Sequence, residues 1–277
     1  MGRHTGAMTS PTAVRTSRDV VTAAGPDALT FLQGQLSQDL TNLAPGEATW
    51  SFLLQPQGKV DAWLRVHRAG HEELRLDVDT GFGAAVVTRL ERFKLRTKCD
   101  LTLAEATPVI AVRGAMVEGG LSCGWPGPGG VDLIGVDADE IPAGVDEADA
   151  AWLESMRVAA GVPKMGAELT EATIPAEVGQ WIIDLSVSFT KGCFTGQELV
   201  ARIDSRGGNV PRRLRAVVAD RPLAAGAAVV VGGAEVGRVT SVAGPVGLAY
   251  VQRKVEPPAD GEVDGTPVAV RELPLAG

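Results

Sequence analysis

The chain has 277 residues, of which 45% are hydrophobic and 22% charged, and its formal net charge is −8. This composition is that of an ordinary globular protein, and the length allows one large or two small domains. The acidic balance argues against direct nucleic-acid binding, and no apolar run reaches the length of a membrane span. Because the first ten residues lack the apolar core of a signal peptide, we expect a flexible leader and a cytoplasmic protein.

The cysteines and histidines exclude further classes of protein. Cys99, Cys123 and Cys193 have no CxxC spacing, which indicates reduced thiols and neither a disulfide framework nor a zinc site. The three histidines are few and scattered, so we expect no metal centre.

The first part of the chain predicts a mixture of strands and helices. Gly25-Pro26-Asp27 opens a helix in which leucines recur every three or four residues as far as Leu40. The patterns that follow predict strands at 48–54, 59–67 and 74–78, a helix at 82–96, a β pattern at 101–112, a loop at 124–130, a strand at 131–136, and a helix at 147–160 that ends at Gly161. This order is typical of the α+β class.

The end of the chain has a different character. From about residue 215, short valine-rich strands alternate with Gly and Pro turns, and Gly232-Gly233 fits a two-residue hairpin loop. This pattern predicts a small β-barrel. We therefore divide the chain into a flexible leader (1–14), an α+β body (15–214) and a C-terminal barrel (215–277).

The most informative segment is residues 191–198, with the sequence Lys-Gly-Cys-Phe-Thr-Gly-Gln-Glu. Thr195 and Glu198 fit a capping box, which predicts that a helix begins at Thr195. Cys193 would then lie near the positive end of the helix dipole and near the ammonium group of Lys191, and both favour the reactive thiolate. The alternative is a small buried cysteine beside an ordinary helix cap.

This segment resembles the signature of the YgfZ family of folate-binding proteins, which are relatives of the aminomethyltransferase (T-protein) of the glycine cleavage system. Supporting segments are Phe-Leu-Gln-Gly-Gln at 31–35, Gln-Gly-Lys at 57–59 and Gly-Arg-Val-Thr-Ser at 237–241. The similarity extends from about residue 15 to residue 252. It implies a T-protein-like body of two related α+β parts, a C-terminal barrel and a central pocket for tetrahydrofolate.

The resemblance also implies folate contacts. Trp152 matches a tryptophan that contacts folate, and burial in the core is the alternative. Glu177 matches the glutamate that holds the pterin, and a plain surface charge is the alternative. Arg206 belongs to an arginine-rich stretch at 202–215, which fits a folate tail, a phosphate backbone or a solvated face. Glu198 completes the candidate set.

Two functions compete on these grounds. The resemblance implies a tetrahydrofolate-binding protein that supports iron–sulfur cluster assembly or repair, and thereby tRNA-modifying iron–sulfur enzymes as clients, with Cys193 as the reactive residue. The alternative is an aminomethyltransferase or another one-carbon transferase. Two observations argue against a transferase. Ala62 and Trp63 occupy the positions that are acidic in the T-protein. Asp61 is one residue away, and a shift of one residue in a strand places the side chain on the other face. Arg18 occupies the place of the family's second folate tryptophan.

Overall fold

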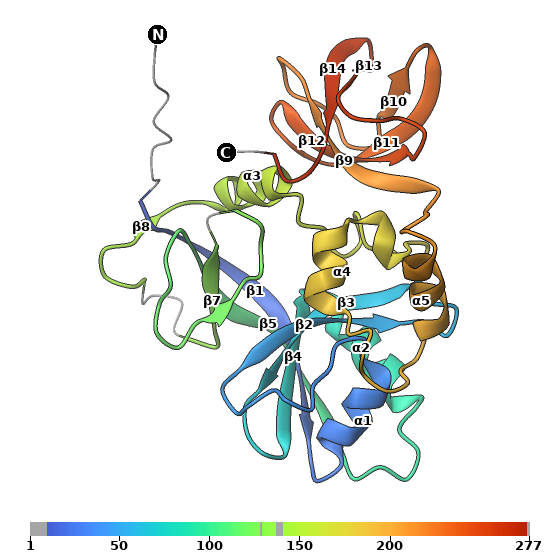
Figure 1. Ribbon diagram of the computed structural model, residues 1–277. Coiled ribbons are helices and arrows are strands. Elements are labelled where there is room, and N and C mark those ends of the chain that lie inside the picture. The colour runs from blue at the N-terminus through green and yellow to red at the C-terminus, as the bar shows by residue number, and fades with distance from the viewer. Residues whose placement is uncertain (1–9, 128, 137–140, 276–277) are drawn as a thin grey trace.

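The protein, described by a computed structural model over residues 10–127, 129–136 and 141–275, consists of an α+β body and a C-terminal barrel. The barrel is stacked on the body, and helix α3 (Ala150–Ala160) lies between them (Figure 1). Most of the expected leader, residues 1–9, lies outside the described residues, whereas residues 12–14 already belong to the first strand.

Within the described residues, the strands of the body form one sheet of eight in the order β2-β3-β4-β1-β5-β7-β6, with β8 paired to β1. The bounds are β1 (Thr12–Ala24), β2 (Ala48–Leu54), β3 (Val60–Arg68), β4 (Glu73–Asp79), β5 (Asp100–Arg113), β6 (Leu121–Ser122), β7 (Gly130–Ile134) and β8 (Asp146–Glu147). The strands predicted at 48–54, 59–67 and 74–78 are confirmed to within one residue at each end.

The central strand β1 is the longest of the elements that the sequence did not reveal. Arg18 and Asp19 stand in its middle and interrupt the apolar pattern, and a bulge in the pairing with β5 falls at the same place. The buried carboxylate of Asp19 accepts hydrogen bonds of 2.9 Å from the backbone amides of Gly81, Gly83 and Ala106. Asp19, which interrupts the apolar pattern of the strand, therefore fixes the start of helix α2 (Gly83–Glu91).

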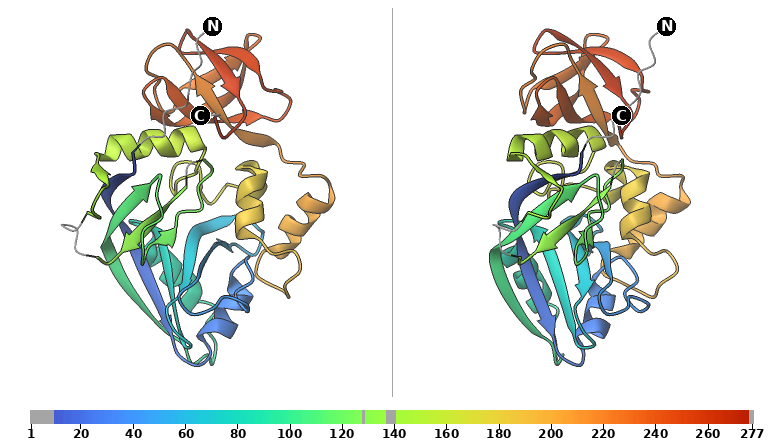
Figure 2. Two further views of the ribbon diagram at one scale, coloured as in Figure 1. Left: turned by 60° about the vertical axis from the view of Figure 1, so that its left-hand side comes forward. Right: turned by 90° about the vertical axis from the view of Figure 1, so that its left-hand side faces the viewer.

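Short helices cover the sheet. Their bounds are α1 (Ala28–Gln35), α2 (Gly83–Glu91), the 3-10 helix η1 (Pro175–Glu177), α4 (Gln180–Ser186) and α5 (Gln197–Ser205). Helix α2 contacts β1, β4 and β5, α4 contacts β2, and α3 contacts both β1 and the barrel. The side views show α3 as the layer between sheet and barrel (Figure 2).

The helices predicted from leucine spacing are present but shorter. Helix α1 ends at Gln35 because Leu36 turns to extended backbone, with φ −102° and ψ 150°. Helix α2 ends at Glu91, and the left-handed backbone of Arg96 (φ 55°) is incompatible with the predicted end at 96. Helix α3 starts three residues late, but it ends at Gly161 in the left-handed conformation, as predicted.

The C-terminal barrel is confirmed. Its strands are β9 (Arg212–Val218), β10 (Ala228–Val231), β11 (Ala234–Ala243), β12 (Val246–Gln252), β13 (Ala259–Val263) and β14 (Thr266–Arg271), closed in the order β10-β11-β12-β9-β14-β13. The predicted hairpin turn joins β10 to β11, with φ +59° at Gly232 and +79° at Gly233. The fully buried residues of the barrel core are valines and alanines, in keeping with a chain that has few aromatic residues.

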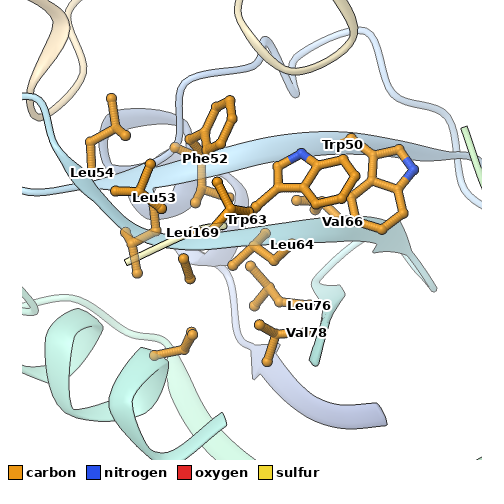
Figure 3. Close-up of a cluster of buried hydrophobic side chains, with 14 of the residues drawn as sticks. Trp50, Phe52, Leu53, Leu54, Trp63, Leu64, Val66, Leu76, Val78 and Leu169 are labelled. Atoms are coloured by element: carbon orange, nitrogen blue, oxygen red, sulfur yellow. The ribbon is translucent and has the colours of Figure 1, made fainter. Parts of the chain in front are cut away.

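The scarce aromatic side chains gather in the body. Trp50 and Phe52 of β2 lie beside Trp63 of β3, above the aliphatic side chains of β3 and β4 (Figure 3). The pairing of the two strands places Phe52 opposite Trp63 and Trp50 opposite Arg65. This hairpin therefore carries the aromatic wall of the cavity described next.

Candidate functional site

A central cavity of about 360 Å³ lies between the sheet and helix α3. This volume is within the range of small-molecule sites in proteins. Its walls combine the aromatic rings of Trp50, Trp63, Phe82 and Trp125 with the cationic groups of Arg18, Arg113, Arg157 and Lys164. The carboxylates of Asp79, Asp132 and Glu154 also line the cavity and pair with the three arginines. A site of this composition fits a flat, polar molecule whose negative charge would pair with Lys164.

The aromatic wall is a stacked pair of tryptophans. The ring centroids of Trp50 and Trp63 are 4.1 Å apart with an interplanar angle of 23° (Figure 3). The indole N–H of Trp63 donates a 2.9 Å hydrogen bond to the hydroxyl of Ser186, and Trp181 packs edge-on against the same ring. Because these contacts fix the orientation of Trp63, the pair is a rigid surface for stacking.

A buried charge network supports this wall from behind. The guanidinium group of Arg65 is fully buried and pairs with Asp77 at 2.9 Å and with Asp132 at 3.0 Å. It also lies over the Trp50 ring, 5.4 Å from the centroid. Burial alone would lower the pKa of Arg65, but the two carboxylates outweigh it and the pKa is raised. The Arg65 guanidinium group is therefore held in its charged form, and it lies against the tryptophan ring.

Arg113 extends the network to the other side of the cavity. It pairs with Asp132 at 3.0 Å and lies over the Trp125 ring, 4.1 Å from the centroid. Burial opposes the charge of Asp132, but Arg65 and Arg113 hold the pKa of its carboxyl group below the ordinary value. The cation and the indole together form a second flat surface.

Two buried donors in the cavity wall are left without a partner. The indole N–H of Trp50 and the Nε–H of Arg113 make no hydrogen bond to any other part of the described chain. Both residues are 5% exposed and both line the cavity. A buried donor without an acceptor costs on the order of 1–3 kcal/mol. A bound molecule with acceptor atoms would recover this cost, so these donors favour a ligand that accepts hydrogen bonds.

Helix α3 supplies the polar side of the cavity. The guanidinium group of Arg157 forms a bidentate pair with Glu154, with distances of 2.9 and 2.6 Å. The side chain of Lys164 is exposed, and within the described residues it has no hydrogen-bond or ion-pair partner. This lysine is therefore available to an anionic group of a bound molecule.

The second candidate feature is the loop of residues 188–196, where the signature segments of the sequence meet. The ammonium group of Lys191 donates hydrogen bonds of 2.7, 2.8 and 2.9 Å to the carbonyl oxygens of Gln33, Leu36 and Gln38. Burial lowers the pKa of Lys191 to about 8, against the opposing effect of Asp39. The lysine therefore anchors the loop to the C-terminal end of α1.

The same loop touches the turn between β2 and β3. A Cβ atom on Gly196 would lie 2.5 Å from the carbonyl oxygen of Gln55 and 3.2 Å from the Cα of Gly58. A Cβ atom on Gly58 would lie 2.9 Å from the carbonyl oxygen of Gly196. Both glycines have positive φ, +80° at Gly58 and +83° at Gly196. The close approach of the two backbones explains why both segments need glycine here.

Cys193 lies exposed on this anchored loop. The predicted capping box is wrong, since α5 has Gly196 as its N-cap and makes no side-chain cap hydrogen bond. Gly196, which lies in tight contact with the β2–β3 turn in the left-handed conformation, is the N-cap in place of Thr195, and the helix begins at Gln197. The carbonyl oxygen of the Gln197 side chain instead accepts a 3.2 Å hydrogen bond from the backbone of Phe194.

The other predicted site residues lie apart from these two features. Among the described residues that line the central cavity, Trp152, Glu177, Glu198 and Arg206 do not occur. Trp152 is half-buried on α3, the helix that places Glu154 and Arg157 in the cavity wall. Glu198 and Arg206 are exposed at opposite ends of α5.

Glu177 is buried and already has partners. Its carboxylate pairs with Arg212 at 3.1 Å and accepts a 3.3 Å hydrogen bond from the backbone of Ile174. Arg213 and Arg215 likewise bond within the chain, to the carbonyl oxygen of Gly208 and to Glu272. Of these arginines, Arg212 therefore ties the barrel to the body, whereas Arg213 and Arg215 bond to residues next to the barrel strands β9 and β14.

The structure also places the residues that bear on one-carbon transfer. Trp63 lines the cavity, whereas Asp61 lies at a bulge in the β2–β3 pairing and pairs with Arg89 of α2 at 2.9 Å. Arg18 lines the cavity and pairs with Asp79 at 2.9 Å. The carboxylate expected on the other face of the strand is thus directed to α2 and not to the cavity.

Sequence reasoning did not identify Trp50, Trp125, Arg113 or Arg157 as cavity residues. The signal for Trp50 was present, since the hairpin turn at 55–58 places it diagonally across from Trp63. Among the described residues, no group of three His, Cys, Asp or Glu side chains is arranged to hold a metal ion. The described helices include none with the length and apolar character needed to cross a bilayer.

Comparison with known proteins bears on the family and the fold of the chain. Residues 212–274 match the family model described as CAF17, C-terminal beta-barrel domain. A protein from Edwardsiella ictaluri named tRNA-modifying protein YgfZ is 27% identical over 219 residues, which cover 68% of this chain and 65% of that protein. A protein from Phaeosphaeria nodorum, named iron-sulfur cluster assembly factor IBA57 homolog, mitochondrial, is 30% identical over 213 residues, which cover 69% of this chain and 51% of that protein.

The fold has a solved counterpart. The crystal structure of glycine cleavage system aminomethyltransferase T from Bartonella henselae has a TM-score of 0.76 and 20% identity, and the match covers 96% of this chain and 86% of that chain. At this identity the likeness establishes the fold alone, which is that of the T-protein (GcvT). Together with the barrel match and the sequence relatives, it shows that the chain belongs to the YgfZ/CAF17 family of GcvT-like proteins.

Proposed function

We propose that this protein binds a reduced folate in the central cavity and supports the assembly or repair of iron–sulfur clusters in client enzymes, including tRNA-modifying ones. The observation that carries the proposal is the cavity wall, in which the stacked Trp50–Trp63 pair stands beside cations and unpartnered donors. Tetrahydrofolate has a flat pterin, an aminobenzoyl ring and a glutamate carboxylate, and each suits one of these groups.

The link to iron–sulfur clusters rests on the names of the relatives. One relative is named a tRNA-modifying protein and another an iron-sulfur cluster assembly factor. Two features of the segment 191–198 support this role. Its cysteine is exposed, and its loop is anchored at both ends. In this proposal Cys193 is the reactive residue, and Lys191 acts by holding the loop in position. The proposed site of action is the cytoplasm.

The folate roles of Trp152, Glu177, Glu198 and Arg206 stay predictions. Trp152 is the strongest of these, because it shares α3 with the cavity residues Glu154 and Arg157. Glu177 would have to leave Arg212 before it could bind a pterin. A comparison of substitutions at Trp152 and at a cavity tryptophan separates these possibilities.

Calorimetric titration of the pure protein with tetrahydrofolate under reducing conditions tests the folate proposal. Trp125→Leu removes one flat wall of the cavity and should weaken binding by about tenfold, the value of a stacked aromatic group. Phe189→Leu, an exposed aromatic outside the cavity, should leave binding unchanged. Absence of binding at millimolar folate in the unmodified protein would refute the proposal. An equal loss in both variants would show that the central cavity is not the site.

The competing function is aminomethyl transfer, which the T-protein fold alone leaves open. That reaction, by resemblance, needs an acidic side chain at the position occupied here by Ala62 and Trp63. Asp61 is engaged with Arg89 of α2. We therefore propose that the protein lacks aminomethyltransferase activity. Production of methylene-tetrahydrofolate in the presence of the other glycine cleavage components would contradict this.

A further inference from the structure

A single buried carboxylate, that of Glu168, joins the barrel to the cavity wall. Glu168 is fully buried. One carboxylate oxygen accepts hydrogen bonds from the hydroxyl groups of Thr240 and Ser241, at 2.5 and 2.6 Å. The other accepts from the guanidinium group of Arg157 at 3.2 Å and from the backbone amide of Lys164 at 3.0 Å. Each oxygen therefore faces a different part of the molecule.

The two sides of this carboxylate belong to different domains. Thr240 and Ser241 lie on β11 of the barrel, within the Gly-Arg-Val-Thr-Ser segment at 237–241. Arg157 and Lys164 line the central cavity. Helix α3, which carries Arg157, is the layer between sheet and barrel in all views (Figures 1 and 2). Glu168 thus lies behind the cavity wall and does not line the cavity itself.

The contacts of Arg157 show how the Glu168 carboxylate fixes the position of its guanidinium group. Its Nε and one terminal nitrogen are committed to Glu154, and its other terminal nitrogen bonds to Glu168 and to the carbonyl oxygen of Val162. Burial alone would lower the pKa of Arg157, but Glu154 and Glu168 outweigh it and raise the pKa. Four of the five N–H donors of this buried guanidinium group are thus engaged, which fixes its orientation. Loss of Glu168 would leave one of these directions unpaired.

We infer that Glu168 is a positioning residue that couples docking of the barrel to ligand binding in the central cavity. The hydroxyl groups of the barrel hold the carboxylate, and the carboxylate holds Arg157 and the Lys164 backbone in the geometry that faces the ligand. Coupling of this kind is reciprocal, so a ligand that contacts this wall must also stabilise the docked barrel. The ligand part of the inference rests on the proposed function, with an anionic, flat molecule such as a reduced folate as occupant.

A ligand-free experiment tests the positioning role by itself. The double variant T240V/S241A removes both barrel hydroxyl groups with little change in side-chain shape. Neither substituted residue lines the central cavity. Hydrogen exchange followed by mass spectrometry should show faster exchange, by about tenfold, in the peptide that contains the Lys164 amide. Peptides from the central strand β5 should exchange as before. Thr266→Val, which removes a hydroxyl from strand β14 away from Glu168, is the matched control.

A folate titration of the same variants tests the coupling. T240V/S241A should bind tetrahydrofolate about tenfold more weakly than the unmodified protein. The single variant Thr240→Val should lose part of this affinity. Thr240→Ser, which keeps a hydroxyl group, should retain most of it. In the unmodified protein, folate should slow exchange in β11. Unchanged exchange at Lys164 in the double variant would overturn the positioning role.

The two levels of the inference fail in different ways. If the unmodified protein binds no folate but the Lys164 amide still responds to T240V/S241A, the proposed function fails and the positioning role stands. If folate binds the unmodified protein and T240V/S241A with equal affinity, the coupling is wrong and the proposed function stands. Glu168→Gln is a supplementary variant, because the loss of a buried charge partner could also prevent folding.

Discussion

The ammonium group of Lys191 donates a 2.8 Å hydrogen bond to the carbonyl oxygen of Leu36, the C-cap residue of helix α1. The same group also bonds to the carbonyl oxygens of Gln33 and Gln38. Backbone carbonyls at a helix end have no partner within the helix and need an external donor. The lysine of the signature segment is therefore a C-terminal cap supplied from a distant part of the chain.

Replacing this lysine should destabilise the body. Lys191→Met keeps the length of the side chain but leaves the carbonyl oxygens without a donor, and we expect a loss of about 2 kcal/mol in the free energy of unfolding. Urea unfolding followed by circular dichroism measures it. Lys254→Met is the control, since this exposed lysine has no partner within the described residues and its loss should change stability by less than about 0.5 kcal/mol. Equal effects of the two changes would contradict the anchoring role.

The two glycines of the cysteine loop should differ sharply in their tolerance of alanine. At Gly196 the added Cβ would lie 2.5 Å from the carbonyl oxygen of Gln55, and φ is +83°. We expect Gly196→Ala to cost about 2–4 kcal/mol in the free energy of unfolding. At Gly192 the added Cβ would meet nothing within 4 Å. Gly192→Ala should therefore be nearly neutral in the same urea titration, and a reversed order would show that the loop is not packed against the β2–β3 turn.

The three cysteines should react in a defined order. Cys193 is exposed, whereas Cys99 and Cys123 are buried, and burial raises the pKa of both of these thiols. Alkylation of the folded protein near neutral pH, followed by peptide mapping, should therefore modify Cys193 first. The other two should react at a comparable rate only after denaturation. Early labelling of Cys99 or Cys123 in the folded protein would contradict this order.

Asp19 should give the protein a defined sensitivity to acid. Burial opposes its charge, but hydrogen bonds from the amides of Ala106, Gly83 and Gly81 hold the pKa of its carboxyl group below the ordinary value of 3.8. As the pH falls, the unfolded chain takes up this proton before the folded chain does. The stabilisation is therefore complete well above pH 3.8 and is lost as the pH falls through the lowered pKa.

Asp19→Asn isolates this contribution. We expect the variant to be less stable than the unmodified protein by about 1–3 kcal/mol near neutral pH, because a charged acceptor of backbone amides is lost. The difference between the two proteins should shrink as the pH approaches the lowered pKa of Asp19. Urea unfolding at a series of pH values measures it, and a difference that is constant down to acid pH would disprove the assignment.

The accuracy of the sequence predictions follows from how local each signal is. The strands of the β2–β3 hairpin and the Gly232-Gly233 turn depend on neighbouring residues, and the structure confirms them. Strand β1 was missed because its polar residues, the half-buried Arg18 and the buried Asp19, have partners from β4 and from the start of α2. The helix start at Thr195 was wrong because a contact with Gly58, far away in sequence, decides it.

The prediction of cavity residues from sequence was limited in the same way. Trp152 carries a recognisable resemblance, but the residues of α3 that line the cavity are its neighbours Ala150, Leu153, Glu154 and Arg157. Which face of this helix is turned to the cavity depends on the packing of α3 between the sheet and the barrel. The spacing of residues within a helix of this length does not determine such packing.

The anchoring of the cysteine loop has a consequence for biosynthesis. Lys191 and Gln33 are separated by 158 positions in the chain, so the ribosome must complete most of the polypeptide before this contact can form. Until then, the nascent helix around residues 28–35 lacks its terminal cap, and the loop has no surface on which to rest. The native conformation around Cys193 therefore forms only in a chain whose body has folded, and a truncated or stalled product lacks it.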